Sequence, residues 1–224
     1  MYHWVEDKDF IKRSYSQCAG IVNELVQRLK SYDIDAGMYV VGSKKRNMIT
    51  QNGEEDIDYD FNLLIRNAKD FSEGELKKTV QIAFNHVLTK HGMENCNDSK
   101  SVLTTKTMRL KKGNQTGFKM DICIVSYCDD GQLQRLIHKK TGRDQFDQWY
   151  WNKVPNSKDL QEKERKLKPK YWAEVRDVYL VKKNYYLRWQ NYYHPSFNCY
   201  IEAVNEVYDN RVRYENFSVV NFRR

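Results

Sequence analysis

The stretch that decides the fold is residues 38–65, MYVVGSKKRNMITQNGEEDIDYDFNLLI. A short apolar run at residues 38–41 stops at Gly42-Ser43, which predicts a buried strand that ends in a tight turn. A basic and polar loop follows. From residue 56 onward the side chains alternate with a period of two, which predicts a second strand with one apolar face and one acidic face. The apolar face comprises Ile57, Tyr59, Phe61, Leu63 and Ile65, and the acidic face begins with Asp56, Asp58 and Asp60.

The acidic face brings like charges close together. Same-face neighbours in a strand lie roughly 6.5–7 Å apart at Cα, so these carboxylates can converge on a shared ion. Their mutual repulsion is costly unless cations or water neutralise it, and hard divalent cations such as Mg²⁺ take oxygen ligands. Asp121 lies in the apolar run of residues 120–125, where a carboxylate needs a partner. If the two strands are neighbours, Asp58, Asp60 and Asp121 are candidate ligands of one metal site.

Gly42-Ser43 is a candidate phosphate-binding turn. Glycine lets the backbone approach a phosphate closely, and exposed N–H groups with a serine hydroxyl can hold a triphosphate. Lys44 and Arg46 add positive charge there, and Lys183, on a predicted helix with several tyrosines, is a further candidate for contact with a triphosphate. Each feature alone is more often structural, as a turn, a solvated sheet face or a solvated lysine. Their order along the chain is what indicates a site.

The predicted elements form two domains. Residues 1–154 hold the sheet, with a helix over residues 9–32, a second helix over 72–90 that the capping box Ser72-x-x-Glu75 opens, and a hairpin over 102–110 and 117–127. Residues 155–224 form a helical domain, with helices over 157–168, 171–189 and 197–208. The apolar stripe of the helix over 171–189 is Tyr171, Val175, Val178, Val181 and Tyr185. The expected fold class is α+β.

Composition favours an anionic partner. The chain of 224 residues has a net charge of +8, a balance typical of proteins that bind nucleotides or nucleic acid and also compatible with simple solubility. No apolar run approaches the ~20 residues that span a bilayer, and the first residues lack the order of a signal peptide. The five cysteines are widely spaced without a CxxC motif, which favours reduced thiols. We therefore expect a cytoplasmic protein without membrane contact.

The order strand, Gly42-Ser43, acidic strand and later Asp121 resembles the DNA polymerase β-like nucleotidyltransferase superfamily. The matching residues are Val40-Val41-Gly42-Ser43, Asp58-Tyr59-Asp60-Phe61 and Lys119-Met120-Asp121-Ile122, within residues 38–127. Among its members the chain is most similar to stand-alone bacterial proteins. The resemblance implies a nucleotidyltransferase-type mixed β-sheet with flanking helices over residues 1–154, as a catalytic domain, followed by a C-terminal helical domain.

The resemblance also implies the chemistry. It implies transfer of a nucleoside monophosphate from an NTP, with Mg²⁺ or Mn²⁺ held by Asp58, Asp60 and Asp121. Asp56 stays as the substitute ligand, because Asp56 and Asp58 fit the usual spacing after Gly-Ser, whereas the residues after Asp60 continue the strand as in the similar proteins. Asp121 is also the candidate base, or orienter, for the acceptor hydroxyl.

Two other functions remain open. A glycosyltransferase can also hold a metal and a sugar nucleotide through Asp-x-Asp, although that function does not account for Gly42-Ser43 or Asp121. The second alternative is a catalytically inactive nucleotidyltransferase-fold module that binds RNA or a protein partner. For an active enzyme, the acceptor could be RNA or tRNA, a second nucleotide, a protein side chain or a small molecule.

Overall fold

The computed structural model describes residues 1–68, 70–155, 157–189 and 194–213. The chain divides into two compact units, one of Val5–Pro155 and one of Met1–Trp4 with Asn156–Arg224. Each unit is described by itself below. Within the described part of the chain, every helix is too short or too polar to span a membrane.

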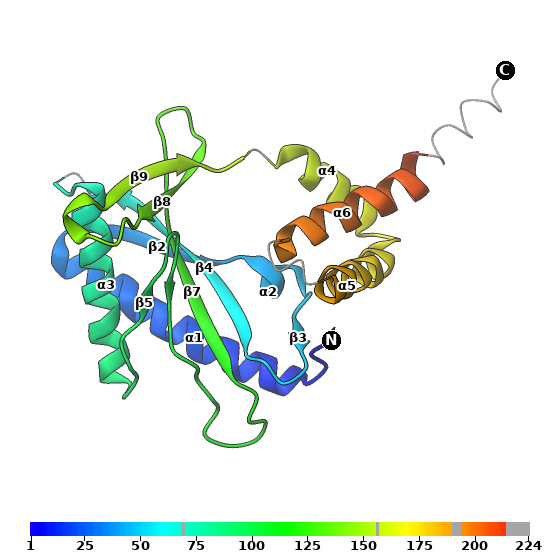
Figure 1. The fold of residues 1–224 in the computed structure, drawn as a ribbon, viewed down its shortest axis with the longest axis horizontal. Helices are drawn as coiled ribbons and strands as arrows, with labels where there is room; N and C mark the ends of the chain where they lie inside the picture. Colours follow the sequence, from blue (N-terminus) through cyan, green and yellow to red (C-terminus); the bar gives the residue numbers. More distant parts are fainter. Residues whose placement is uncertain (69, 156, 190–193, 214–224) are drawn as a thin grey trace. The chain divides into compact units, whose positions relative to one another are not determined.

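A mixed sheet forms the centre of the Val5–Pro155 unit (Figure 1). Its main path follows the order β2-β4-β7-β6-β5, and β8 pairs with both β7 and β9. The pairing of β4 with β7 is parallel, whereas the other pairings are antiparallel. The strands are β2 (Asp35–Val40), β4 (Ile57–Asn67), β5 (Asn97–Asp98), β6 (Leu103–Thr104), β7 (Phe118–Tyr127), β8 (Leu133–Lys139) and β9 (Gln148–Lys153).

Two helices, α1 (Lys8–Leu29) and α3 (Glu73–Lys90), contact each other and share one hydrophobic core with the sheet. The predicted apolar face of β4 lies in this core, and Tyr59 and Phe61 are fully buried. The predicted capping box opens α3: the Ser72 hydroxyl accepts from the Glu75 N–H, and the Glu75 carboxylate accepts from the Ser72 N–H. The α+β class, with a mixed sheet and flanking helices followed by further helices, is confirmed.

Three predicted details of the sheet unit are wrong. β2 begins at Asp35, three residues early, because residues 35–37 already pair with the end of β4. The loop after Val41 contains a short helix, α2 (Gly42–Arg46), and a strand, β3 (Thr50–Asn52). The strand predicted over residues 102–110 reduces to β6 and an isolated bridge between Met108 and Phe118. Its pairing with β7 is interrupted at Lys106 and Thr107, where the Thr107 side chain turns to Asp56.

The second unit is helical. It contains α4 (Lys158–Leu167), α5 (Trp172–Arg188), α6 (Ser196–Tyr208) and a π-helical turn over Asp209–Arg213. The N-terminal β1 (Tyr2–Trp4) belongs to this unit and not to the sheet unit, because the Asn184 side chain bonds both the N–H and the carbonyl of Tyr2. The assignment of residues 1–154 and 155–224 to a catalytic and a helical domain stays a prediction.

The apolar stripe predicted for α5 is partly wrong. Val181 is 67% exposed and Tyr185 is 55% exposed. The buried positions of α5 are instead Val175, Tyr179, Lys183 and Asn184. The helix offers apolar residues on more than one face, so spacing of three and four residues did not identify the buried face.

Candidate active site

The parallel register of β4 and β7 brings the predicted carboxylates to one face of the sheet. Asp60 lies directly opposite Asp121, and Asp58 lies opposite Lys119. Neighbouring strands are about 4.8 Å apart, and paired residues of parallel strands point to the same face. The opposite face holds Tyr59 and Met120, which are fully buried. The acidic face is therefore the solvent side, where Asp60 and Asp121 are half-buried and Asp58 is exposed.

Electrostatics distinguishes this cluster from a solvated row of charges. Restricted hydration among the surrounding atoms, and then the charges of Asp121 and Asp60, raise the pKa of Asp58 to about 6, although part of its side chain stays accessible to water. Desolvation and the Asp121 charge also raise the pKa of Asp60. Desolvation raises the pKa of Asp121, against a hydrogen bond from Thr104. The three carboxylates destabilise one another when ionised, so the site favours a bound cation or proton.

Thr104 orients the Asp121 carboxylate. Thr104 in β6 pairs with Asp121 in β7, and its hydroxyl donates to Asp121 Oδ1 at 2.5 Å. This bond holds one carboxylate oxygen and leaves Oδ2 for another partner. The sequence did not reveal Thr104 as a site residue, because only the strand pairing places it beside Asp121.

Asp56, the substitute ligand, is already engaged. The carboxylate accepts from the Thr107 hydroxyl and lies 3.0 Å from Lys119 Nζ. Partial burial opposes ionisation, but these two contacts outweigh it and lower the pKa of Asp56. Gly117 provides the necessary space, because a Cβ at this position would lie 1.9 Å from Asp56 Oδ1. Lys119 could have been found from the sequence, since it lies two residues before Asp121 on the same face.

Gly42 lies against Asp60. Gly42 has a φ of +64°, and a Cβ built on it would lie 1.9 Å from Asp60 Oδ2. The Val41 N–H donates to the Asp60 carbonyl at 2.9 Å, which ties the start of α2 to β4. Only glycine therefore allows the backbone of the Gly42-Ser43 turn to approach the carboxylate so closely.

The predicted basic residues of the turn have defined surroundings. Arg46 Nη1 donates to the Gly42 carbonyl at 3.1 Å. Burial and the Asp121 charge raise the pKa of Asp60, and the positive charge of Arg46 offsets only part of this rise. Lys44 Nζ lies 4.9 Å from the centroid of the Tyr15 ring. Both cations therefore belong to the same unit as the carboxylates.

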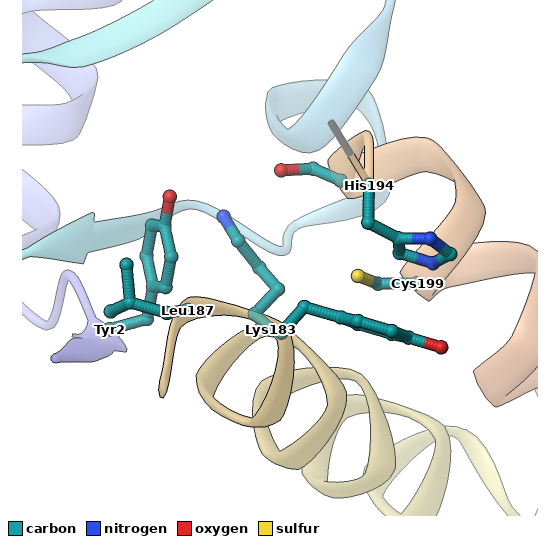
Figure 2. A pocket seen from close by; sticks show the side chains of 7 residues that line it. Tyr2, Lys183, Leu187, His194 and Cys199 are labelled. Carbon is teal, nitrogen blue, oxygen red and sulfur yellow. The ribbon is translucent and has the colours of Figure 1, made fainter. Parts of the chain in front are cut away.

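Lys183 lies in the other unit, in a small pocket (Figure 2). The side chain is 9% exposed, and Nζ lies 3.7 Å from the centroid of the Tyr2 ring. His194 stacks on Tyr186 with ring centroids 3.7 Å apart. The pocket has a volume of about 100 Å³ and is lined by Tyr2, Lys183, Tyr186, Leu187, His194, Ser196 and Cys199. The size suits a small polar group, and the buried ammonium favours an anion.

The donor chemistry of the cluster fits a hard divalent cation. Among the described residues, no three His, Cys, Asp or Glu side chains are arranged closely enough to hold a metal as they stand. Asp58, Asp60 and Asp121 nevertheless offer carboxylate oxygens on one face with raised pKa values. Mg²⁺ is bound through one or two carboxylates together with waters and substrate phosphates, so it does not need a closed cage of protein ligands.

Comparisons with known proteins find similarity only among solved structures. No family model matches the chain, and no curated protein matches it. The chain is similar to the Vibrio cholerae DncV cyclic AMP-GMP synthase in complex with nonhydrolyzable GTP, at 12% identity and a TM-score of 0.47 over 67% of this chain. It is similar to the Bradyrhizobium diazoefficiens CD-NTase CdnG in complex with GTP, at 13% identity and a TM-score of 0.42 over 67% of this chain.

DncV is a prokaryotic cGAS homolog, and CdnG is a CD-NTase. The matched region is 39% of the DncV chain and 39% of the CdnG chain. Both TM-scores lie below 0.5, so the function has to be inferred from the site's own geometry.

Proposed function

We propose that this protein is a nucleotidyltransferase that transfers a nucleoside monophosphate from an NTP to an acceptor hydroxyl. The observation that carries the proposal is the register of β4 and β7, which aligns Asp60 with Asp121 on the face that also presents Asp58. The close approach of Gly42 to Asp60 supports it, because the candidate phosphate turn and the candidate metal ligands then adjoin.

In this proposal Asp58, Asp60 and Asp121 hold Mg²⁺ or Mn²⁺. The metal would polarise the transferred phosphoryl group and neutralise charge that develops on its oxygens. Asp121 would orient the acceptor hydroxyl and accept its proton. The hydroxyl oxygen then bonds the α-phosphorus of the NTP, the bond between the α-phosphorus and the bridging oxygen to the β-phosphate breaks, and pyrophosphate leaves. The hydrogen bond from Thr104 to Oδ1 fixes the orientation of the Asp121 carboxylate. Asp56, held by Lys119 and Thr107, is not among the proposed ligands.

The basic turn would hold the NTP. Gly42-Ser43 would contact the triphosphate through the backbone and the serine hydroxyl, with Lys44 and Arg46 supplying positive charge. Lys183 lies in the other unit, and its contact with a phosphate stays a prediction.

A transfer assay tests the proposal. The protein is incubated with each α-³²P-labelled NTP, Mg²⁺ or Mn²⁺, and total RNA including tRNA, and label is followed in RNA, in protein and in small products. We expect transfer to one of these acceptors, and we expect Asp58→Asn, Asp60→Asn and Asp121→Asn each to abolish it. Asp70→Asn is the matched control, because it removes the same charge from an exposed position outside the cluster.

Asp56→Asn separates the two possible ligand pairs. Transfer that survives Asp56→Asn but not Asp60→Asn assigns the metal to Asp58 and Asp60. The reverse result assigns it to Asp56 and Asp58. Absence of both transfer and metal-dependent NTP binding in the wild-type protein would contradict the enzyme proposal and favour the inactive module that binds RNA or a protein.

A further inference from the structure

A row of basic side chains lies on the segment between β6 and β7. Lys106, Arg109, Lys111 and Lys112 fall within seven residues, and residues 99–120 contain no acidic residue. All four side chains are exposed. Among the described residues, none of the four side chains has an ion pair or a hydrogen bond. The row is therefore an exposed concentration of positive charge, which we call the cationic edge, and the Arg109 charge also acts on Asp56.

The cationic edge adjoins the carboxylate cluster. Lys106 lies between Thr104, which donates to Asp121, and Thr107, which donates to Asp56. The segment is anchored along β7, because the Thr105 N–H donates to the Met120 carbonyl at 3.0 Å, and residue 108 bridges to residue 118. The hydrogen bonds from Thr104 to Asp121 and from Thr107 to Asp56 therefore fix the start of the cationic edge beside the candidate active site.

The dimensions of the row suit a chain of phosphates. Lys106 and Lys112 are six residues apart, so the row spans no more than about 22 Å of backbone. A single NTP carries its negative charge in one triphosphate, whereas the cationic edge places four cations along seven residues. A polynucleotide can neutralise charges spread over such a length, because its phosphates repeat along the strand and basic side chains that replace its counterions gain affinity without reading sequence.

We propose that the cationic edge binds the backbone of a single-stranded polynucleotide, whose terminal hydroxyl is the acceptor of the transfer. The inference rests on the proposed function for the acceptor role, but strand binding can be measured without catalysis. A single strand fits one row of cations that leads to the carboxylates, and its end can reach Asp121 without a second strand in the way. Direct contact with bases is not required.

The test measures binding separately from transfer. A fluorescein-labelled, uridine-rich RNA is titrated with protein in EDTA without NTP, at about 50 and about 200 mM KCl. Four neutralised phosphate contacts predict a slope of log K against log salt near −3 for a single strand. The variant Lys106→Gln/Arg109→Gln/Lys111→Gln/Lys112→Gln should bind at least about tenfold more weakly, with a slope close to zero.

The matched control removes the same charges elsewhere on the same unit. Lys30→Gln/Lys78→Gln/Lys139→Gln/Arg143→Gln also replaces three exposed lysines and one exposed arginine, and it should keep the affinity and slope of the wild type. Far-UV circular dichroism checks that both variants fold. If the edge variant unfolds, Lys111→Gln/Lys112→Gln replaces it, with a slope expected to fall by about 1.4.

Each result decides the inference. Equal RNA binding by the edge variant and the control would overturn it, and so would a poly-glutamate peptide that competes as well as RNA, since the edge would then select a protein. Loss of binding in the edge variant alone supports the surface. Transfer to RNA with a free 3′-hydroxyl, absent when that end is blocked, supports the acceptor role. Strand binding with transfer to another acceptor but not to RNA would overturn the acceptor role alone. Strand binding with neither transfer nor metal-dependent NTP binding would overturn the proposed function as well, while the binding surface stands.

Discussion

The contact between Gly42 and Asp60 predicts a large effect of one added methyl group. In Gly42→Ala the Cβ would lie 1.9 Å from Asp60 Oδ2, whereas ordinary contacts begin near 3.4 Å, so one of the two groups has to move by about 1.5 Å. A φ of +64° adds strain for alanine, about 1–2 kcal/mol. Displacing a reacting group by about 1 Å can cost about 100-fold in rate. We therefore expect transfer to fall at least about 100-fold.

Gly53→Ala is the matched control for this prediction. Gly53 has a φ of +54°, but nothing lies within 4 Å of a Cβ built there. Both variants should lose about 2–8 °C in Tm from backbone strain, measured by thermal unfolding. Only Gly42→Ala should lose transfer in the α-³²P assay. If Gly42→Ala keeps transfer within about threefold of Gly53→Ala, the reasoning that places Gly42 against a catalytic carboxylate is wrong.

Three further predictions concern the electrostatics and support of the sheet unit. Asp58→Asn should raise the Tm of the metal-free protein by a few degrees at pH 8, because a pKa raised from 3.8 to about 6 means that the ionised group destabilises the fold. The gain should vanish below about pH 3, where the group is largely protonated in both states, and persistence there would contradict the cause. Thr104→Ala should lower kcat about tenfold with an unchanged KM for the NTP. Thr104→Ser should restore kcat, because the serine hydroxyl can again donate a hydrogen bond to Asp121. A serine variant as slow as the alanine variant would refute a positioning role. Lys77→Met should cost about 3 kcal/mol in urea unfolding, because Lys77 is 2% exposed and lies 2.7 Å from Asp98; a loss below about 1 kcal/mol would show that the pair contributes little.

Patterns confined to one segment could be predicted from the sequence. The period of two in residues 57–65 identified both faces of β4, since alternation is a property of any extended chain. The Ser72 capping box marked the start of α3, because its bonds close within one turn. Such signals weakened where neighbouring segments decide the outcome: Val181 and Tyr185 fit a helical stripe, yet both are exposed.

The candidate site also combines features that the sequence predicted with features that depend on contacts between segments. The sequence by itself placed Asp58 and Asp60 on one face and indicated Gly42, Asp121 and divalent-metal chemistry. Their roles, and that of Lys183, stay predictions that the transfer assay tests. The sequence could not choose between Asp56 and Asp60 as the partner of Asp58, because alternation puts all three on the same face.

Only the tertiary structure decided which side chains meet. The parallel register aligned Asp60 with Asp121. The packing of β6 and the segment after it against this face allowed Thr104 to donate a hydrogen bond to Asp121 and Thr107 to donate one to Asp56. The physical reason is that a strand fixes the direction of its own side chains, whereas register and contact depend on how segments far apart in the chain pack together. A shift of one residue between β4 and β7 would have kept every local pattern and separated the carboxylates.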